Sequence, residues 1–576
     1  MIFSVWAPAA KSVELVTAAR RVALTVDDRG YWQAEVDAAD VRAGYRYSID
    51  GGGPLPDPRS RWQPQGVHGP SQVPELRPAA PRATQFRPRA LRDAVIYELH
   101  IGTFTPTGTY AAARERLGHL ADLGITHVEL MPLATFPGRR GWGYDGVDLY
   151  APLPAYGTPG ELADFTAACH EQGLAVLLDV VYNHLGPDGN YLGAYGPYFT
   201  DRVKTPWGQA VNYDGAQSDE VRRFFIDNAL MWLGDYGFDG LRLDAVHAIF
   251  SFEAVHVLED LAAAVRKLSV EQDRELVLIA ESDLNDPRLV LPAARGGFAL
   301  DAHWADDFHH ALHRYFTDEA GGYYADYHGL PDIATALAQG YVYQGQYSAF
   351  RQRRHGRAPR GVTPDQLVVC SQNHDQIGNR ARGERLSMLV AAPKLKAIAA
   401  LTLLSPFVPL LFQGEEWGAR TPFLYFTDHE DAELGRLVSE GRAREFQSFR
   451  WAGEIPDPQD ASTFERSKLD WAELLQPAHA EMLDWYRALI ALRKSRSRHV
   501  VPAKPKVRFD VKSQWLRFEY AGVLALLNFA NVPKRIGLPP GEWELALDSQ
   551  AREPAGEARA ELPAHGTRIF RRLNEA

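Results

Sequence analysis

The chain of 576 residues is predicted to be an α/β protein: a (β/α)8 TIM barrel flanked by an N-terminal and a C-terminal β-sandwich. Three observations predict it. Eight short apolar segments lie between residues 94 and 416, amphipathic stretches separate most of them, and alternating strand patterns precede and follow this region. Repeated β–α units favour parallel strands with right-handed crossovers. Eight units favour closure into a barrel, and a doubly wound sheet is the structural alternative.

The N-terminal region, residues 1–90, has the pattern of a β-sandwich. Short alternating segments such as "SVELV" and "YWQAEV" are separated by Gly, Asp and Pro, which is typical of strands and turns. Residues 51–90 are rich in Pro and Gly and show no helical period. We interpret that stretch as a domain edge and connector.

The catalytic barrel with its loop insertions is predicted for residues 91–495. Amphipathic stretches such as "ELADFTAACHEQG" supply the helices between its strands. The eight candidate strands are "AVIYELH", "HVELMP", "AVLLDVVYNH", "GLRLDAV", "LVLIAES", "FALDAHWA", "LVVCSQNHD" and "VPLLFQGEE".

Residues 496–576 return to alternating strands and predict the C-terminal β-sandwich. Its candidate strands are "PKVRFDVK", "WLRFEYA", "VLALLNFA" and "GEWELALD". The longest apolar stretch, "AIAALTLLSPFVPLLF" at 397–412, is short for a membrane span and contains two prolines. It predicts a buried helix that leads into a buried strand.

Composition excludes several classes of protein. The net charge of −11 argues against nucleic acid as a partner. The two cysteines, Cys169 and Cys370, cannot form a disulfide framework or a CxxC site. No basic residue precedes Lys11, so the apolar start is not typical of a signal peptide. We expect a cytoplasmic protein with no membrane partner.

Polar residues follow four of the predicted strands, where a barrel of this kind builds its active site. A single aspartate after a strand is usually a helix cap or turn residue, but this coincidence of four strand ends favours a site. These residues are Asp179, Asn183, His184, Arg242, Asp244, Glu281, His374 and Asp375.

The paired carboxyls suit cleavage of a glycosidic bond with retention, which needs two such groups about 5–5.5 Å apart. Arg242 and Asp244 are two residues apart and so share one face of a strand. The arginine would favour the ionised form of Asp244 and suit it to act as the nucleophile. Glu281 would act as the acid, with its pKa raised by burial and nearby negative charge.

Four segments together resemble the α-amylase family of glycoside hydrolases: "DVVYNH" (179–184), "GLRLDAVH" (240–247), "AES" (280–282) and "NHD" (373–375). The resemblance implies that Asp244 is the nucleophile, Glu281 the general acid/base and Asp375 the third carboxylate, which binds sugar hydroxyls. It implies substrate contacts around the cleaved bond from Tyr144, His184, Arg242, His247 and His374.

Further segments resemble the maltooligosyl trehalose trehalohydrolases within that family: "AESDLNDPR" (280–288), "WADDFHHALH" (304–313), "NHDQIGNR" (373–380) and "TPFLYFTDHE" (421–430). The resemblance implies hydrolysis of the α-1,4 bond next to a terminal trehalose unit, with release of trehalose. It also implies a functional pairing with a maltooligosyl trehalose synthase.

A pocket for terminal trehalose is expected to use polar residues at the barrel mouth. The candidates are Asp306, Asp307, Phe308, His309, Gln376, Asn379 and Arg380. No metal ion or cofactor is predicted, because the insertion after Asn183 is short for a calcium loop. A glucan branching or debranching enzyme is the alternative within the family. A carbohydrate-binding protein on an inactive barrel is disfavoured, because all three carboxylates are present.

Overall fold

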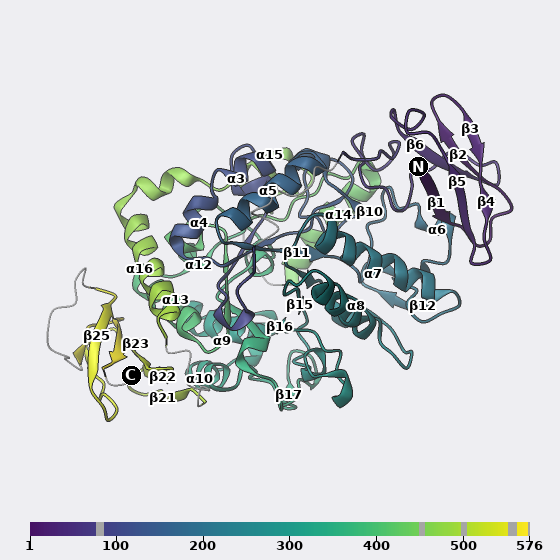
Figure 1. Ribbon diagram of the computed structural model, residues 1–576. Helices are drawn as coiled ribbons and strands as arrows, with labels where there is room; N and C mark the ends of the chain where they lie inside the picture. The colour runs from purple at the N-terminus through teal and green to yellow at the C-terminus, as the bar shows by residue number, and fades with distance from the viewer. Residues whose placement is uncertain (76–85, 449–454, 497–503, 551–560, 574–576) are drawn as a thin grey trace.

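The computed structural model describes residues 1–75, 86–448, 455–496, 504–550 and 561–573 (Figure 1). Eight parallel strands form a closed barrel, in which the last strand pairs with the first. They are β7 (Ile96–Leu99), β8 (His127–Leu130), β11 (Ala175–Val180), β14 (Gly240–Leu243), β15 (Val277–Ala280), β16 (Ala302–Trp304), β19 (Leu367–Cys370) and β20 (Val408–Phe412). Each lies in a predicted segment, so the barrel is confirmed and the doubly wound sheet is wrong.

The barrel strands are apolar because they are covered on both faces. All six residues of β11 are buried, for example. In α8, Leu258, Leu261 and Val265 are buried at the spacing of one helical face. The longer helices after the strands are α5 (Pro159–Glu171), α7 (Ser218–Asp235), α8 (Val257–Glu271), α9 (Asp306–Thr317), α10 (Leu330–Gln339), α13 (Ala392–Leu404), α14 (Ala432–Ser448) and α16 (Pro477–Lys494).

Antiparallel sheets lie at the two ends of the molecule (Figure 1). The N-terminal region has two three-stranded sheets: β1 (Ile2–Trp6), β5 (Tyr31–Glu35) and β4 (Thr25–Val26), and β3 (Arg21–Ala23), β2 (Val13–Thr17) and β6 (Tyr45–Ile49). The C-terminal sheet contains β21 (Lys506–Asp510), β22 (Trp515–Tyr520), β23 (Val523–Asn528), β27 (Thr567–Arg572) and β25 (Trp543–Asp548). Domain boundaries at residues 90 and 495 stay predictions.

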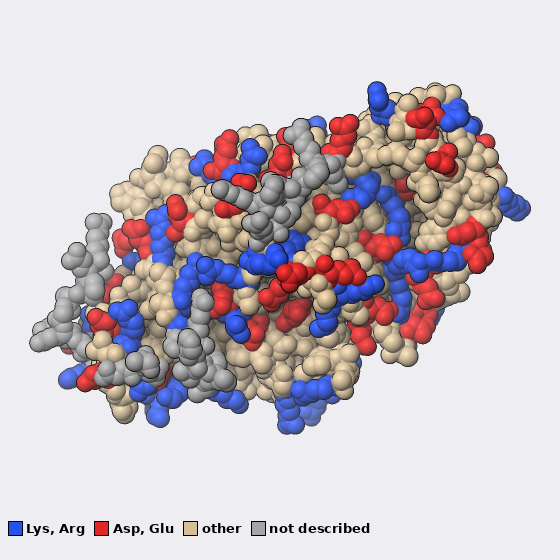
Figure 2. All heavy atoms as spheres, in the orientation of Figure 1, with Lys and Arg blue, Asp and Glu red and all other residues tan. Residues whose placement is uncertain are grey.

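The apolar stretch at 397–412 forms most of α13 and then β20, as predicted. Among the described residues, no helix combines the length and apolar character needed to cross a membrane. Acidic and basic side chains are interspersed over the face shown in Figure 2.

The longest insertion that borders the barrel mouth lies between β16 and β19. It contains α9, α10 and a short hairpin of β17 (Tyr347–Ser348) and β18 (Arg353–Arg354). Asp326 fixes this hairpin, because its carboxylate accepts hydrogen bonds from the Ser348 hydroxyl and from the Phe350 amide at 3.0 Å. The insertion therefore presents a fixed wall beside the ends of β15 and β16.

Candidate active site

Arg242 lies at the centre of the polar cluster predicted at the strand ends. Its side chain is 1% exposed, and its guanidinium lies 4.3 Å from the ring centre of Trp304. Nη1 donates to both carboxylate oxygens of Asp179, at 2.9 and 2.7 Å, and to Oδ1 of Asp244 at 2.7 Å. Nη2 lies 3.8 Å from Oε2 of Glu281. One buried cation therefore contacts carboxylates from three neighbouring strands.

Asp244 is held in one orientation by groups on both of its carboxylate oxygens. Arg242 binds Oδ1, and the side-chain amide of Asn183 donates to Oδ2 at 2.7 Å. The same amide donates to the Asp244 carbonyl at 2.9 Å. These hydrogen bonds therefore fix the orientation of the Asp244 carboxyl group.

Glu281 has different surroundings, which favour its protonated form. Its Oε2 accepts a hydrogen bond of 2.6 Å from the amide of Ala245, a residue with a left-handed φ of 39°. Burial raises the Glu281 pKa well above its ordinary value. The charges of Asp244, Asp306 and Asp375 raise this pKa further, whereas Arg242 opposes the shift.

His374 connects the cluster to Glu98 on β7. Its Nδ1 lies 2.5 Å from Oε1 of Glu98, and its Nε2 lies 2.7 Å from the Tyr144 hydroxyl. Burial opposes the charge of His374, but the carboxylates of Glu98 and Asp375 outweigh it and raise its pKa to about 9. The Tyr144 hydroxyl donates to Asp179 at 2.7 Å. A cationic imidazole and an arginine thus meet through Tyr144 and Asp179.

Asp375 and Asp306 lie at the more open side of the cluster. The Asp375 side chain is 42% exposed, and its Oδ1 lies 3.5 Å from Nε2 of His374. Burial raises the pKa of Asp306 to about 7, and the nearby carboxylates of Asp283 and Asp375 contribute. Asp306 therefore lies close enough to the cluster for the charges of its carboxylates to raise the Asp306 pKa.

His184 also reaches the cluster. Its Nε2 lies 3.0 Å from the Tyr144 carbonyl oxygen, and burial lowers its pKa. Its ring stacks on Trp207 at 4.5 Å between centroids, and that indole is 47% exposed. His184 is 5% exposed, so the exposed flat surface is that of the Trp207 indole, a type of surface suited to stacking on a sugar ring.

Three predicted trehalose contacts, Asp307, Phe308 and His309, have protein partners in this structure, and their contact with substrate stays a prediction. The Asp307 carboxylate accepts four hydrogen bonds, of 2.5–2.8 Å, and Asp307 is 2% exposed. Phe308 packs against Phe407, and His309 bonds the Ser371 carbonyl and the Tyr324 hydroxyl. All three residues are buried among these partners.

The other predicted contacts lie nearer the surface or are paired. His247 and Asn379 are exposed, and Gln376 is half-buried, with its Oε1 accepting from the Asn373 amide at 3.1 Å. The Arg380 guanidinium makes two hydrogen bonds with Glu319, at 2.7 and 2.8 Å. Of these four, Gln376 is next to Asp375 and so lies nearest the cluster in sequence.

Two buried glutamates on neighbouring barrel strands were not among the site residues predicted from the sequence. Glu98 on β7 and Glu129 on β8 are register partners, and each is 1% exposed. Glu98 binds His374, whereas both Glu129 oxygens have no hydrogen-bond partner among the described residues. The signal was present, because "IYEL" and "HVEL" each place a carboxylate inside an apolar strand.

The part of the chain that the structure describes contains no group of three or more His, Cys, Asp or Glu side chains arranged to hold a metal ion. Two cations, Arg242 and His374, contact the carboxylates of the cluster instead. The arrangement places the oriented carboxyl group of Asp244 near Glu281, whose pKa is raised well above its ordinary value.

Comparisons with known proteins give the family. Residues 89–196 match the model of the alpha amylase catalytic domain. The malto-oligosyltrehalose trehalohydrolase of Rhizobium sp. (strain M-11) is 46% identical over 583 residues, covering 99% of this chain and 97% of the relative. A solved structure from Salmonella typhimurium, whose title assigns it provisionally to the alpha amylases, has a TM-score of 0.89 and 37% identity, covering 99% and 97% of the two chains.

The branching enzymes, which were the alternative within the family, are more distant relatives of this chain. A 1,4-alpha-glucan branching enzyme from Bacillus caldolyticus is 33% identical over 341 residues, covering 52% of this chain and 50% of that enzyme. The trehalohydrolase match extends over nearly the whole of both chains. This chain belongs to the malto-oligosyltrehalose trehalohydrolases, within the α-amylase family of glycoside hydrolases.

Proposed function

We propose that this glycoside hydrolase cleaves the α-1,4 bond next to the terminal trehalose unit of maltooligosyl trehalose. The products are trehalose and a maltooligosaccharide. The observation that carries the proposal is the Arg242 guanidinium, which contacts Asp244 at 2.7 Å and Glu281 at 3.8 Å. One guanidinium thus contacts both carboxyls, and double displacement requires two carboxyls close together at the cleaved bond.

In the first step, Asp244 attacks the anomeric carbon and forms a covalent glycosyl ester. Glu281 transfers its proton to the glycosidic oxygen, and the bond to the trehalose unit breaks. In the second step, Glu281 removes a proton from water, which attacks the same carbon and releases Asp244. Each step inverts the configuration at the anomeric carbon, so the two steps together retain it. Glu281 regains from water the proton that it gave to the glycosidic oxygen.

The surroundings of each carboxyl support these roles. Arg242 and Asn183 bind the two carboxylate oxygens of Asp244 and orient this group for attack. Glu281 is buried near other carboxylates, so its pKa is well above its ordinary value and its acid form persists. We assign Asp375, with His374 and Tyr144, to binding the hydroxyl groups of the sugar at the cleaved bond.

Selectivity for the trehalose unit belongs on the leaving-group side of the site. Trehalose has no reducing end, and its 1,1-linkage turns the second ring away from the path of maltose. We assign this side to Asp306 and Gln376, each partly exposed next to the cluster. A site that hydrogen-bonds a particular group can reject an analogue without it by about 10⁴-fold or more.

The substrate requires an enzyme that converts the reducing end of a maltooligosaccharide into a trehalose unit. We therefore infer a functional pairing with a maltooligosyl trehalose synthase. The expected cytoplasmic location is part of this proposal. It is supported by two cysteines that are both free and buried.

Product analysis on maltooligosyl trehalose, maltooligosaccharide and amylose tests the proposal. The expected result is trehalose from the first substrate, with only slow hydrolysis of the others. New α-1,6 linkages in amylose would instead identify a branching enzyme. Asp244→Asn and Glu281→Gln should each lower kcat by about 10²–10⁴-fold or more, while substrate still binds. Near wild-type kcat in either variant would contradict that assignment.

A further inference from the structure

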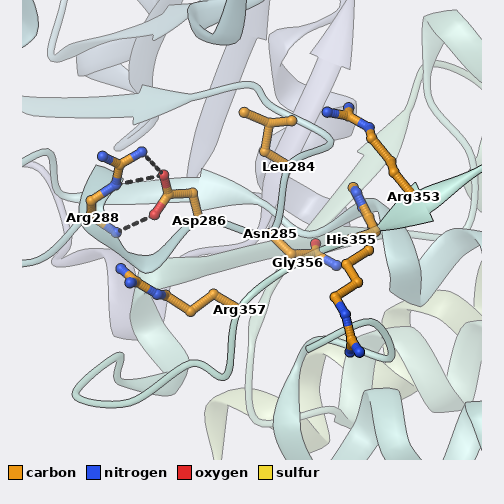
Figure 3. A pocket seen from close by; sticks show the side chains of 9 residues that line it. Leu284, Asn285, Asp286, Arg288, Arg353, His355, Gly356 and Arg357 are labelled. Carbon is orange, nitrogen blue, oxygen red and sulfur yellow. Dashed lines mark hydrogen bonds and ion pairs between the residues drawn. The ribbon is translucent and has the colours of Figure 1, made fainter. Parts of the chain in front are cut away.

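A pocket of about 420 Å³ is lined in part by the loop that follows β15, a few residues after Glu281. One wall is the segment 284–288, and the other is the segment 353–357, which begins with β18. Figure 3 shows side chains from both segments around this space. The volume is within the range of small-molecule sites, about 300–1,000 Å³.

The lining of this pocket is strongly basic in a protein whose net charge is −11. Four arginines line it against one carboxylate, Asp286, which leaves three formal positive charges unbalanced. Asp286 is bound by Arg288 through Nε and Nη2, at 2.8 and 2.5 Å (Figure 3). Among the described residues, no carboxylate lies within 4.0 Å of the Arg353 or Arg357 guanidinium groups. These two groups remain available to an anion.

The backbone on both sides of the pocket is fixed. The Arg357 amide donates to the Asn285 carbonyl at 3.1 Å and joins the two walls. Gly356 has a φ of 72°, and a Cβ on it would lie 2.1 Å from the Tyr343 carbonyl oxygen. The glycine is thus required for the close approach that forms this wall. Arginines on a fixed backbone lose less freedom when they bind a ligand than arginines on a loose loop.

We propose that this pocket binds a phosphate-bearing small molecule. Guanidinium groups match phosphate oxygens in planar, two-point geometry, and these hydrogen bonds are charge-assisted. A neutral glucan chain fits the pocket poorly, because none of the described residues that line it is a Trp, Tyr or Phe that could stack on a sugar ring. This binding site is separate from the proposed hydrolytic reaction and does not depend on it.

Two contacts join the pocket to the active site. Asn285 lines the pocket, and its side-chain amide donates to Asp307 at 2.8 Å. Arg351, two residues before Arg353, bonds Asp283 at 3.0 Å, and Asp283 is two residues after Glu281. An anion between the two walls would hold together the segments that carry this ion pair. We therefore expect the bound anion to change KM for the glucan substrate.

Isothermal titration of the full-length protein with glucose 6-phosphate tests the binding, with inorganic phosphate and glucose titrated separately at constant ionic strength. The wild type should bind the ester, and the R353Q/R357Q double variant should bind it at least about tenfold more weakly. Arg42→Gln, at an exposed arginine of the N-terminal region, serves as the matched control and should bind as the wild type does.

No binding of either phosphate compound, or equal binding by wild type and R353Q/R357Q, would overturn the proposal. Equal affinity for phosphate and the ester would show that the phosphoryl group alone is recognised, and tighter binding of the ester would show that its sugar contributes. Both support the site. Binding with an unchanged KM would refute the coupling to the active site. Failure of the proposed hydrolysis would leave the titration result unaffected.

Discussion

Substitution of Asp307 can distinguish two roles for this residue: direct contact with trehalose, or support of the wall of the site. Its Oδ2 accepts from the amides of Val342 and Tyr343, at 2.6 and 2.7 Å, and from the Asn285 side chain at 2.8 Å. Its Oδ1 accepts from the Tyr327 hydroxyl at 2.5 Å. Removing the carboxylate therefore affects four buried donors at once.

The structure predicts different costs for two substitutions. Asp307→Ala leaves those donors unpaired, at about 1–3 kcal/mol each, so the folded state should lose about 4 kcal/mol or more. Asp307→Asn keeps an oxygen for the three donors on Oδ2. Its NH₂ group then faces Tyr327, whose hydroxyl can rotate to accept. That change should cost about 1–2 kcal/mol, mainly through the lost charge.

The assays are the midpoint of thermal unfolding and the ratio of kcat/KM for maltooligosyl trehalose to that for maltooligosaccharide. The alanine variant should unfold at lower temperature and lose selectivity, because the wall at 342–343 loosens. The asparagine variant should stay near wild type in both. Asp318→Asn, an exposed change at the end of the same helix, is the control. Loss of selectivity in Asp307→Asn with an unchanged midpoint would refute this reasoning and indicate direct contact.

Three further changes test the cluster. Asp306→Asn should lower the Glu281 pKa, because the Asp306 charge helps to raise it. Activity requires protonated Glu281, so the alkaline limb of the pH profile of kcat/KM should move to lower pH. An alkaline limb at the wild-type pH would contradict this prediction. Glu129→Gln resembles the neutral acid and should keep kcat, so a tenfold loss would contradict a neutral Glu129. Tyr144→Phe removes hydrogen bonds to Asp179 and His374 and should lower kcat/KM by about 10–100-fold. An unchanged kcat/KM would contradict a role for Tyr144 in connecting these two residues.

The barrel could be predicted from sequence because its signal is local and repeated. Parallel strands covered on both faces give apolar runs such as "AVLLDV", and the helices between them show a 3.6-residue period. The polar residues that end the strands could be predicted for the same reason, since strand ends share one rim. Arg242 and Asp244 thus meet Asp179 and Glu281 as the strand order requires.

The outer part of the site could not be predicted in this way. "WADDFHH" placed polar residues at the mouth, but a helix turns successive side chains by about 100°, so Asp306 and Asp307 face different surroundings. Asp306 is half-buried beside the cluster, whereas Asp307 points at the backbone of residues 342–343. That backbone is distant in sequence, and no local pattern indicates it. The Arg353 pocket depends on the same long-range packing.

The crowding of acids at this barrel end explains why one of them can serve as a proton donor. The carboxyls are Glu98, Glu129, Asp179, Asp244, Glu281, Asp306 and Asp375. Two cations, Arg242 and His374, lie among these seven carboxyls, so full ionisation would leave five uncompensated negative charges. Because buried charge is costly, some carboxyls must stay protonated. Burial and neighbouring charge select Glu129 and Glu281, while Arg242 and Asn183 bind Asp244 and leave it the nucleophile. The acid character of Glu281 is thus a property of the whole set, and neutralising Asp375 should also lower its pKa.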